Sequence, residues 1–404
     1  KLIPYNFMRV HKSFIISLDK IVSIRNLKVM IENATIPISE QNIDISAYSS
    51  LAALFEDSFQ RFAERKAYLY MGQALTFAQL DVQSRNFANY LQTLGLEPGA
   101  RVAIMLPNVI QFPVAMIGAL RAGCVVVNTN PLYTARELEH QLNDSGATVL
   151  IVLENFAHIF QSLLGKTQVK HVVVTSLGEQ LGLKGKVIDF VVRHIKKLVP
   201  KWVIPGGHAT FTQAFSIGRM QQPQAVTLTH DSIAFLQYTG GTTGVSKGAV
   251  LLHRNILANL EQVDVWLAPT LSRSPIEQLV FLCALPLYHI FALTANCLTF
   301  MKYGGTNLLI TNPRDMPNFV KELAKYPFTA ITGVNTLFNG LLNCPGFADL
   351  NFSRLKLSLG GGMAVQKPVA ERWQKVTNSR LVEGYGLTEC APLVTVSPFD
   401  LKGF

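Results

Sequence analysis

The residue types best suited to chemistry stand together in one glycine-rich segment, residues 238–248, here called the phosphate segment. It reads Tyr238-Thr239-Gly240-Gly241-Thr242-Thr243-Gly244-Val245-Ser246-Lys247-Gly248 and follows an apolar run, 233–237, that is typical of a buried strand. Glycines let backbone N–H groups converge on a ligand, hydroxyls add donors and a lysine adds positive charge, so the segment suits a polyphosphate. A plain Gly/Thr-rich hairpin turn is the alternative. A Walker A loop is disfavoured because Ser246 and Gly248 stand where that loop needs Gly and Ser or Thr.

Three further motifs follow apolar runs that are typical of strands. Residues 286–289 (Pro-Leu-Tyr-His) offer an imidazole, although a lone histidine in apolar surroundings is more often a core residue. Residues 358–363 carry three successive glycines, which let a flat ligand lie against bare backbone. Residues 384–389 (Gly-Tyr-Gly-Leu-Thr-Glu) offer an aromatic ring, a hydroxyl and a carboxylate, and a tight turn with one exposed tyrosine is the alternative.

The elements that position these motifs alternate between strand and helix. We expect strands near 67–71, 102–106, 125–128, 149–153 and 169–175, and again near 233–237, 279–285, 307–310, 329–333, 355–359 and 380–383. Thr134 and Glu137 form a capping box that opens a helix running to Asp144. Such alternation predicts right-handed βαβ units and mostly parallel sheets. The expected fold class is α/β with two wound halves, about 47–176 and 225–404, and with ligands at the carboxyl ends of the strands.

An irregular segment, 177–224, interrupts this alternation and contains a basic amphipathic stretch at 184–202. Its apolar stripe and its flanking cations are Ile188, Val191, Val192, Ile195, Leu198 and Val199, and Lys184, Lys186, Arg193, Lys196, Lys197 and Lys201. One interpretation is a surface helix packed on the core. The other is a helix that lies on an anionic membrane surface.

Composition places the chain among globular proteins with an anionic partner. Its 404 residues are 49% hydrophobic and carry a formal net charge of +10, which fits a nucleotide, a coenzyme or an acidic lipid headgroup. The basic stripe interleaved with aromatics that is typical of nucleic-acid binders is not found, so nucleic acid is not expected. Five scattered cysteines without a CxxC pattern indicate reduced thiols in a cytosolic protein.

Two charge-poor stretches, 101–121 and 277–302, are long enough for membrane spans. Pro107 and Pro113 interrupt the first and Pro286 the second, so both are interpreted as a buried strand followed by a buried helix.

The N-terminal residues 1–29 differ from the rest. They hold six cationic residues against one acidic residue, a difference of +5, and the sequence coheres only from Met30 onward. Our hypothesis is that residues 1–29 are translated upstream sequence or a non-native extension, and that the main domain occupies 30–404.

Taken together, the four motifs resemble those of the adenylate-forming enzymes: acyl-CoA ligases, luciferases and the adenylation domains of peptide synthetases. The resemblance covers about Ala47 to the C-terminus. The family's phosphate loop usually has Ser followed by Gly and a Pro before its Lys, whereas Gly240 and Ser246 here are similar to bacterial long-chain fatty acid CoA ligases. The runs 130–134, 137–146, 311–315 and 325–333 add to this narrower resemblance.

The resemblance implies a reaction and its residues. A fatty acid is activated by ATP to acyl-AMP and then transferred to coenzyme A, with Mg²⁺ as cofactor. The residues expected to hold the phosphates are Tyr238, Thr239, Gly240, Gly241, Thr242, Thr243, Gly244 and Lys247. Those expected to form the adenine slot are Tyr385 with Gly360, Gly361, Gly362, Gly384 and Gly386.

The remaining implied roles concern the reacting groups. Thr388 would hydrogen-bond the α-phosphate and Glu389 would hold Mg²⁺, a cation that prefers oxygen ligands. His289 would lie near the acyl carboxylate, with Phe291 and Val334 lining the acyl tunnel. The expected catalytic set is Thr242, Lys247, His289, Thr388 and Glu389.

The sequence stops at Phe404, before the ribose-binding Asp and the lid domain of the family, which implies a truncated reading of a longer gene. Two alternatives to a long-chain fatty acid CoA ligase stay open: a ligase for an aryl or medium-chain acid, and a non-catalytic acyl- or nucleotide-binding fragment. The expected location is the cytoplasm, with peripheral contact to the inner face of the cytoplasmic membrane through 184–202. The oligomeric state is open, and a homodimer is one alternative.

Overall fold

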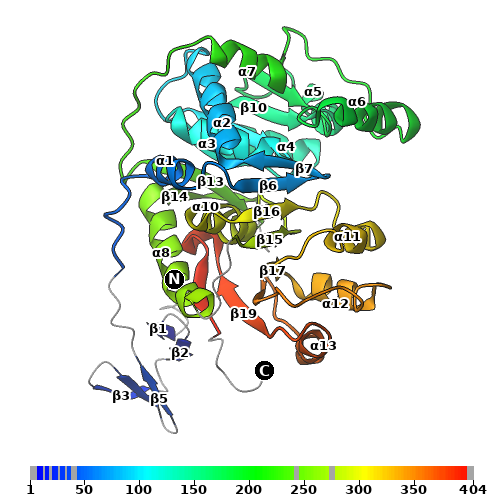
Figure 1. Ribbon diagram of the computed structural model, residues 1–404. Helices are drawn as coiled ribbons and strands as arrows, with labels where there is room; N and C mark the ends of the chain where they lie inside the picture. Colours follow the sequence, from blue (N-terminus) through cyan, green and yellow to red (C-terminus); the bar gives the residue numbers. More distant parts are fainter. Residues whose placement is uncertain are drawn as a thin grey trace.

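The computed structural model describes residues 43–240, 245–272 and 278–397, and five short strands between residues 7 and 37. The chain from residue 43 onward forms two α/β halves built on two mostly parallel sheets, which lie one above the other in Figure 1. The predicted fold class is therefore confirmed.

The first sheet has seven strands in the order β12-β11-β10-β8-β9-β13-β14. Its members are β8 (Arg101–Met105), β9 (Val125–Asn128), β10 (Ala147–Leu153), β11 (His171–Thr175), β12 (Ala209–Thr210), β13 (Ile233–Thr239) and β14 (Lys247–Leu252). Only β14 runs antiparallel to its neighbour. One face packs on α2 (Phe77–Gln92) and α3 (Gln111–Arg121), and the other on α4 (Ala135–Ser145) and α5 (Ala157–Gln161).

The second sheet has eight strands in the order β20-β19-β18-β17-β15-β16-β6-β7. Its members are β6 (Lys66–Tyr70), β7 (Gln73–Thr76), β15 (Val280–Cys283), β16 (Thr306–Leu309), β17 (Ala330–Gly333), β18 (Leu357–Gly361), β19 (Leu381–Gly386) and β20 (Leu393–Val396). Helix α8 (His253–Ser272) covers one face, and α11 (Met316–Leu323), α12 (Asn335–Asn343) and α13 (Lys367–Thr377) cover the other (Figure 1).

A shared apolar core joins the two halves. Helix α1 (Leu51–Phe62) packs there with α3 and with the irregular helical stretch α9 (Ile290–Ala292), η5 (Leu293–Leu298) and α10 (Thr299–Tyr303). Phe55, Ile117 and Leu298 are fully buried in this core. The halves are therefore held by a continuous hydrophobic interior, whose burial contributes roughly 25 cal/mol per Å².

The two sheets exchange strands relative to the ranges expected from sequence. The hairpin β6–β7 stands early in the chain but pairs through β16 with the second sheet. The hairpin β13–β14 stands in the later range but pairs through β9 with the first sheet. This long-range pairing leaves no local signal. The division of the chain into domains remains a proposal.

Local helix signals are confirmed where a specific hydrogen bond defines them. Thr134 and Glu137 form the predicted reciprocal capping box, and Gly146 ends α4 in the left-handed conformation with φ of 64°. Helix α8 follows β14 directly and continues to Ser272. The strands β7, β14 and β20 were not expected.

The interrupting segment forms α6 (Gly182–Phe190), η4 (Val191–Ile195), β12 and α7 (Phe211–Arg219), at the outer end of the first half (Figure 1). The charge-poor stretches fold as β8 with α3 and as β15 with α9 to α10. Within the described part of the chain, no helix combines the length and apolarity that a membrane crossing needs.

The N-terminal strands form two small antiparallel sheets, β1 (Phe7–His11) with β2 (Phe14–Ser17), and β3 (Ile21–Arg25) with β4 (Lys28–Ile31) and β5 (Ala34–Pro37). The proposed boundary at Met30 falls inside β4.

Candidate functional site

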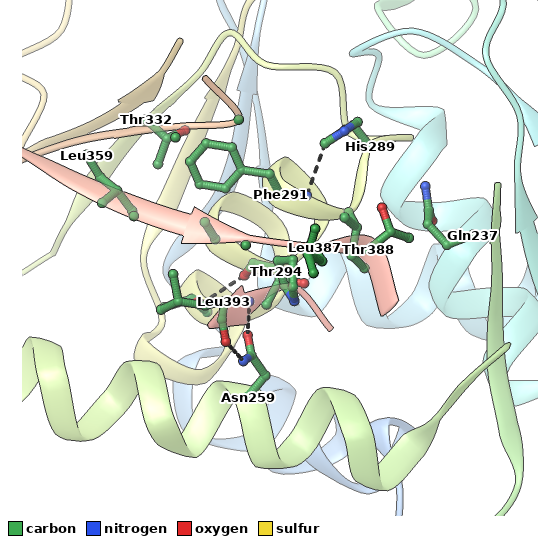
Figure 2. Close-up of a pocket in the computed structure, with 18 of the residues that line it drawn as sticks. Gln237, Asn259, His289, Phe291, Thr294, Thr332, Leu359, Leu387, Thr388 and Leu393 are labelled. Atoms are coloured by element: carbon green, nitrogen blue, oxygen red, sulfur yellow. Dashed lines mark hydrogen bonds between the residues drawn. The ribbon is translucent and has the colours of Figure 1, made fainter. Parts of the chain in front are cut away.

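A cavity of about 820 Å³ lies where the two halves meet, at the carboxyl ends of β9, β13, β18 and β19. Figure 2 looks into it, with the long helix α8 along one side and residues of η5 and β20 in the middle. Residues from all four predicted motifs line this cavity. The strand-end positions expected from sequence therefore converge on one site.

The phosphate segment enters the cavity through its first residues. Tyr238, Thr239 and Gly240 line the wall. Residues Gly241, Thr242, Thr243 and Gly244 lie outside the described residues. Lys247 opens β14 directly opposite Thr239 in the hairpin register, has an exposed side chain and is not among the lining residues.

Helix α4 contacts both sides of this hairpin. The Tyr238 hydroxyl donates to Asp144 Oδ2 at 2.6 Å, and His140 Nε2 hydrogen-bonds the carbonyl oxygen of Ser246 at 2.8 Å. Because a carbonyl only accepts, His140 carries its proton on Nε2. Burial, together with Asp144, raises the pKa of Tyr238, so its hydroxyl stays protonated and can donate.

His289 stands at the mouth of the cavity and caps α9. Its Nδ1 accepts a hydrogen bond from the backbone N–H of Phe291 at 3.3 Å, as Figure 2 shows. The ring is accessible from the cavity, yet desolvation by the surrounding protein lowers the pKa of His289. A neutral imidazole is therefore present at pH 7, with Nε2 left to face a ligand.

Two buried amides that the sequence analysis missed join the halves beside His289. Asn128 Nδ2 donates to Gln237 Oε1 at 2.9 Å, and Gln237 Nε2 donates to the carbonyl oxygen of Tyr288 at 2.6 Å. Both amides line the cavity. The sequence does contain a sign of these residues, because each is a polar residue within or at the end of an otherwise apolar strand.

The glycine motifs form a narrow wall. A Cβ atom at Gly361 would lie 3.0 Å from both the carbonyl oxygen of Gly384 and the ring of Phe291. Gly361, Gly362, Gly384 and Gly386 line the cavity together with Tyr385, a residue that is 49% exposed and so available for stacking. A flat ligand can therefore approach bare backbone on one side and an aromatic face on the other.

Besides Lys247, two other described residues of the predicted site do not line the cavity. Gly360 is a packing position, because a Cβ there would lie 2.3 Å from Val365 Cγ2. Val334 lies behind the wall, since its Cγ1 is 3.6 Å from where a Cβ of Gly362 would stand.

Thr388 and Glu389 form a short turn, η6 (Thr388–Cys390), that follows β19 at the cavity mouth. The Glu389 carboxylate is exposed there, on a turn that lies beside β14. Carboxylate and phosphate oxygens are the ligands that Mg²⁺ prefers, so this residue fits a magnesium-bound phosphate.

The inner end of the cavity is mostly apolar. It is lined by Val263, Trp266, Leu267, Phe281, Phe300, Leu357 and Leu359. Asn259 ties α8 to β20 through its Nδ2, which donates to the carbonyl oxygen of Leu393 at 2.9 Å (Figure 2). The sequence analysis missed this wall because its residues on α8 stand in no recognisable motif.

Two family models match parts of this chain. The model for the AMP-binding enzyme family matches residues 55–403. A second model, the LytTr DNA-binding domain, matches residues 1–45.

Curated relatives agree with the first match. The chain is 58% identical over 361 residues to a long-chain-fatty-acid–CoA ligase of Escherichia coli O6:H1, covering 89% of this chain and 64% of that protein. It is 50% identical over 366 residues to a long-chain-fatty-acid–CoA ligase of Haemophilus influenzae, covering 90% and 65%. The chain thus spans slightly less than two thirds of the length of these relatives.

Solved structures share the fold. An anthranilate CoA ligase in complex with anthranoyl-AMP has a TM-score of 0.74 at 20% identity, with 88% of this chain and 63% of that chain covered. A long-chain-fatty-acid-CoA ligase from Archaeoglobus fulgidus has a TM-score of 0.69 at 22% identity, with 86% and 66% covered. The chain belongs to the AMP-binding enzyme family.

Proposed function

We propose that the protein is a long-chain fatty acid CoA ligase that activates its substrate with ATP. The observation that carries the proposal is one continuous cavity. It joins a glycine-rich phosphate segment, an open aromatic ring, a hydroxyl with a carboxylate, and an apolar inner end. Relatives at 50–58% identity that carry this name support the choice of acid.

The proposed reaction has two displacements. A fatty carboxylate oxygen attacks the α-phosphorus of ATP, the bond to the β-phosphate oxygen breaks, and pyrophosphate leaves. The sulfur of coenzyme A then attacks the acyl carbon of the mixed anhydride, its proton passes to solvent, and AMP leaves. The first step joins two anions, so its barrier falls mainly through positioned hydrogen-bond donors and positive charge.

The described residues have the chemistry for these steps. Thr239, Gly240 and Lys247 flank the position of the departing phosphates, Tyr385 stacks on adenine, and Thr388 donates to the α-phosphate. Neutral His289 orients the carboxylate without forming a fixed ion pair with it, since desolvation lowers its pKa. Mg²⁺ held by Glu389 would neutralise charge on the phosphate oxygens.

The test uses protein expressed from the complete gene and measures fatty-acid-dependent ATP–pyrophosphate exchange. We expect Glu389→Ala to lower the exchange rate about 10²-fold or more, the usual cost of one lost electrostatic contact in the transition state. Glu371→Ala is the matched control, because Glu371 is exposed on α13 and pairs only loosely with Lys367 at 3.9 Å. Exchange by Glu389→Ala at the rate of Glu371→Ala would remove Glu389 from the site.

The substrate class is tested with a chain-length series in the same assay. A long-chain enzyme exchanges pyrophosphate fastest with palmitate or oleate. A maximum at an aryl or medium-chain acid would favour the second ligase class. Ligand binding without exchange for any acid would favour a non-catalytic binding protein.

We also propose a cytoplasmic location with peripheral contact to an anionic membrane through 184–202. Val192 is buried and Ile188, Val191 and Val199 are half-buried, so part of the expected stripe packs on the core. The other two residues of the stripe, Ile195 and Leu198, are exposed, as are Leu183, Val187, Phe190 and Val203. Lysines surround these residues, and Asp189, the sole acidic residue of 182–203, is buried. This combination suits an interfacial helix.

Liposome sedimentation tests the membrane contact. The protein should sediment with vesicles that contain phosphatidylglycerol but not with pure phosphatidylcholine. Reversal of Lys196, Lys197 and Lys201 to Glu should abolish the difference. Equal sedimentation of the reversed variant and the wild type would contradict the contact.

For residues 1–29 we keep the hypothesis of a translated upstream sequence or non-native extension and add an alternative proposal, that this part of the protein binds DNA. The LytTr match over 1–45 and the excess of six cationic residues over one acidic residue in 1–29 support it, because cations release counterions from a phosphate backbone. A mobility-shift titration of duplex DNA with the wild type and with a variant that lacks residues 1–42 separates the two. Equal retardation by both would exclude the DNA-binding role.

A further inference from the structure

Helix α4 is the element that holds the base of the phosphate segment. Its residues His140 and Asp144 stand four positions apart, on one face of the helix. Asp144 accepts from Tyr238, the first residue of the segment, on β13. His140 donates to the carbonyl of Ser246, just before β14 begins. One rigid helix thus contacts both described flanks of the segment.

The helix itself is well fixed. The capping box of Thr134 and Glu137 closes its first turn, and Leu138 and Leu142 are fully buried under the first sheet. Buried Gln141 donates from Nε2 to the carbonyl oxygen of Asn128 at the end of β9, at 3.0 Å. The side chains that reach the phosphate segment therefore start from a fixed base.

Two details argue against purely structural roles for these side chains. A carboxylate in the last turn of a helix is unfavourable beside the helix dipole, so Asp144 does not serve α4 itself. The hydrogen bond to the Ser246 carbonyl also lies outside the β13–β14 ladder. The last pair of that ladder on this side is Thr239 with Lys247, so Ser246 has no partner in it. Without His140 and Asp144, the two flanks would be held by the hairpin alone.

We propose that His140 and Asp144 are positioning residues that fix the two described flanks of the phosphate segment, Tyr238 and Ser246, for binding of the β- and γ-phosphates of ATP. The inference rests on the proposed function of that segment. Because these phosphates are absent from AMP, the two residues should matter for ATP and not for AMP. A side chain that merely stabilises the fold would affect both nucleotides alike.

The test is isothermal titration calorimetry of MgATP and of AMP with the wild type and four variants. We expect His140→Ala and Asp144→Ala each to weaken ATP binding about 5- to 10-fold and to leave AMP binding within about twofold, the usual effect of one lost hydrogen bond. His140→Gln and Asp144→Asn keep a donor and an acceptor at these places and should recover most of the ATP affinity. Arg136→Ala, at an exposed position of the same helix, is the control and should bind both nucleotides like the wild type.

The outcomes are distinct. Unchanged ATP affinity in both alanine variants, or an equal loss for ATP and AMP, would overturn the positioning roles while leaving the proposed function intact. A wild type that binds neither nucleotide would overturn the proposed function and, with it, this inference. Circular dichroism melting of every variant separates misfolding from a local loss of binding.

Discussion

His253 makes the stability of this protein depend on pH between 7.5 and 5. Its side chain is fully buried at the start of α8, and its Nδ1 accepts the backbone N–H of Leu51, the first residue of α1, at 3.0 Å. Desolvation, and secondarily the charge of His230, lower the pKa of His253 to about 4. Protonation of Nδ1 would place a proton against the Leu51 N–H and add charge beside the positive end of α1.

The sign and size follow from proton linkage. In the unfolded chain His253 has a pKa near 6.5, so below that pH the unfolded state binds a proton at this residue while the folded state stays neutral there. The contribution is therefore fully present above pH 6.5 and is lost as the pH falls toward 4. With these two values, His253 alone lowers the free energy of unfolding by about 2 kcal/mol between pH 7.5 and pH 5.

The assay is urea unfolding at both pH values for the wild type and His253→Asn. Asparagine keeps an acceptor close to the position of Nδ1 and does not titrate, so its pH-dependent loss should be smaller by about 2 kcal/mol. His208→Asn is the control, because His208 is exposed and its replacement should preserve the wild-type difference. An equal pH dependence in the wild type and His253→Asn would refute the reasoning.

Three further predictions concern the cavity. Gly240→Ala should leave the melting temperature unchanged, because its Cβ meets no atom within 4 Å, but should weaken ATP binding about 10-fold or more in calorimetry by blocking a backbone donor; unchanged ATP affinity would contradict close phosphate contact there. Ala295→Leu adds three carbons to the cavity lining, which would exclude about three methylenes of a long acyl chain at about 0.8 kcal/mol each. The ratio of kcat/KM for palmitate to that for octanoate should therefore fall about 50-fold. An unchanged ratio would show that the acyl chain binds elsewhere. Gln237→Leu should destabilise the protein by about 2 kcal/mol in urea unfolding, since it leaves Asn128 Nδ2 and the Tyr288 carbonyl without their partner; wild-type stability would show that water replaces the amide fully.

Much of the fold was predictable because its signals are local. The capping box at Thr134 and the short apolar runs that became β9 and β17 each carry their own pattern within a few residues. Sheet membership was not predictable in this way, since nothing near Lys66–Tyr70 indicates that it pairs with a strand more than two hundred positions later. Pairing of this kind is decided by packing of the whole chain.

The site divides in the same manner. Gly361, Tyr385 and Thr388 stand in motifs at strand ends, and all three line the cavity. Trp266 and Asn259 belong to a helix face with no motif, so only the fold reveals that they form the opposite wall. Gly360 differs, because it stands in the same motif as Gly361 but packs against Val365.

The exchange of the hairpins β6–β7 and β13–β14 between the sheets has a consequence during synthesis on the ribosome. The strand that pairs with β9, β13, is complete only once residue 239 has been made, and β6 has no partner on that side until β16 has been made. Neither sheet can be completed early in synthesis. The nascent chain therefore has unpaired strand edges that can associate with other chains. Fragments cut near residue 176 should accordingly be insoluble, and dissection of this protein into independently folding pieces should fail at that position.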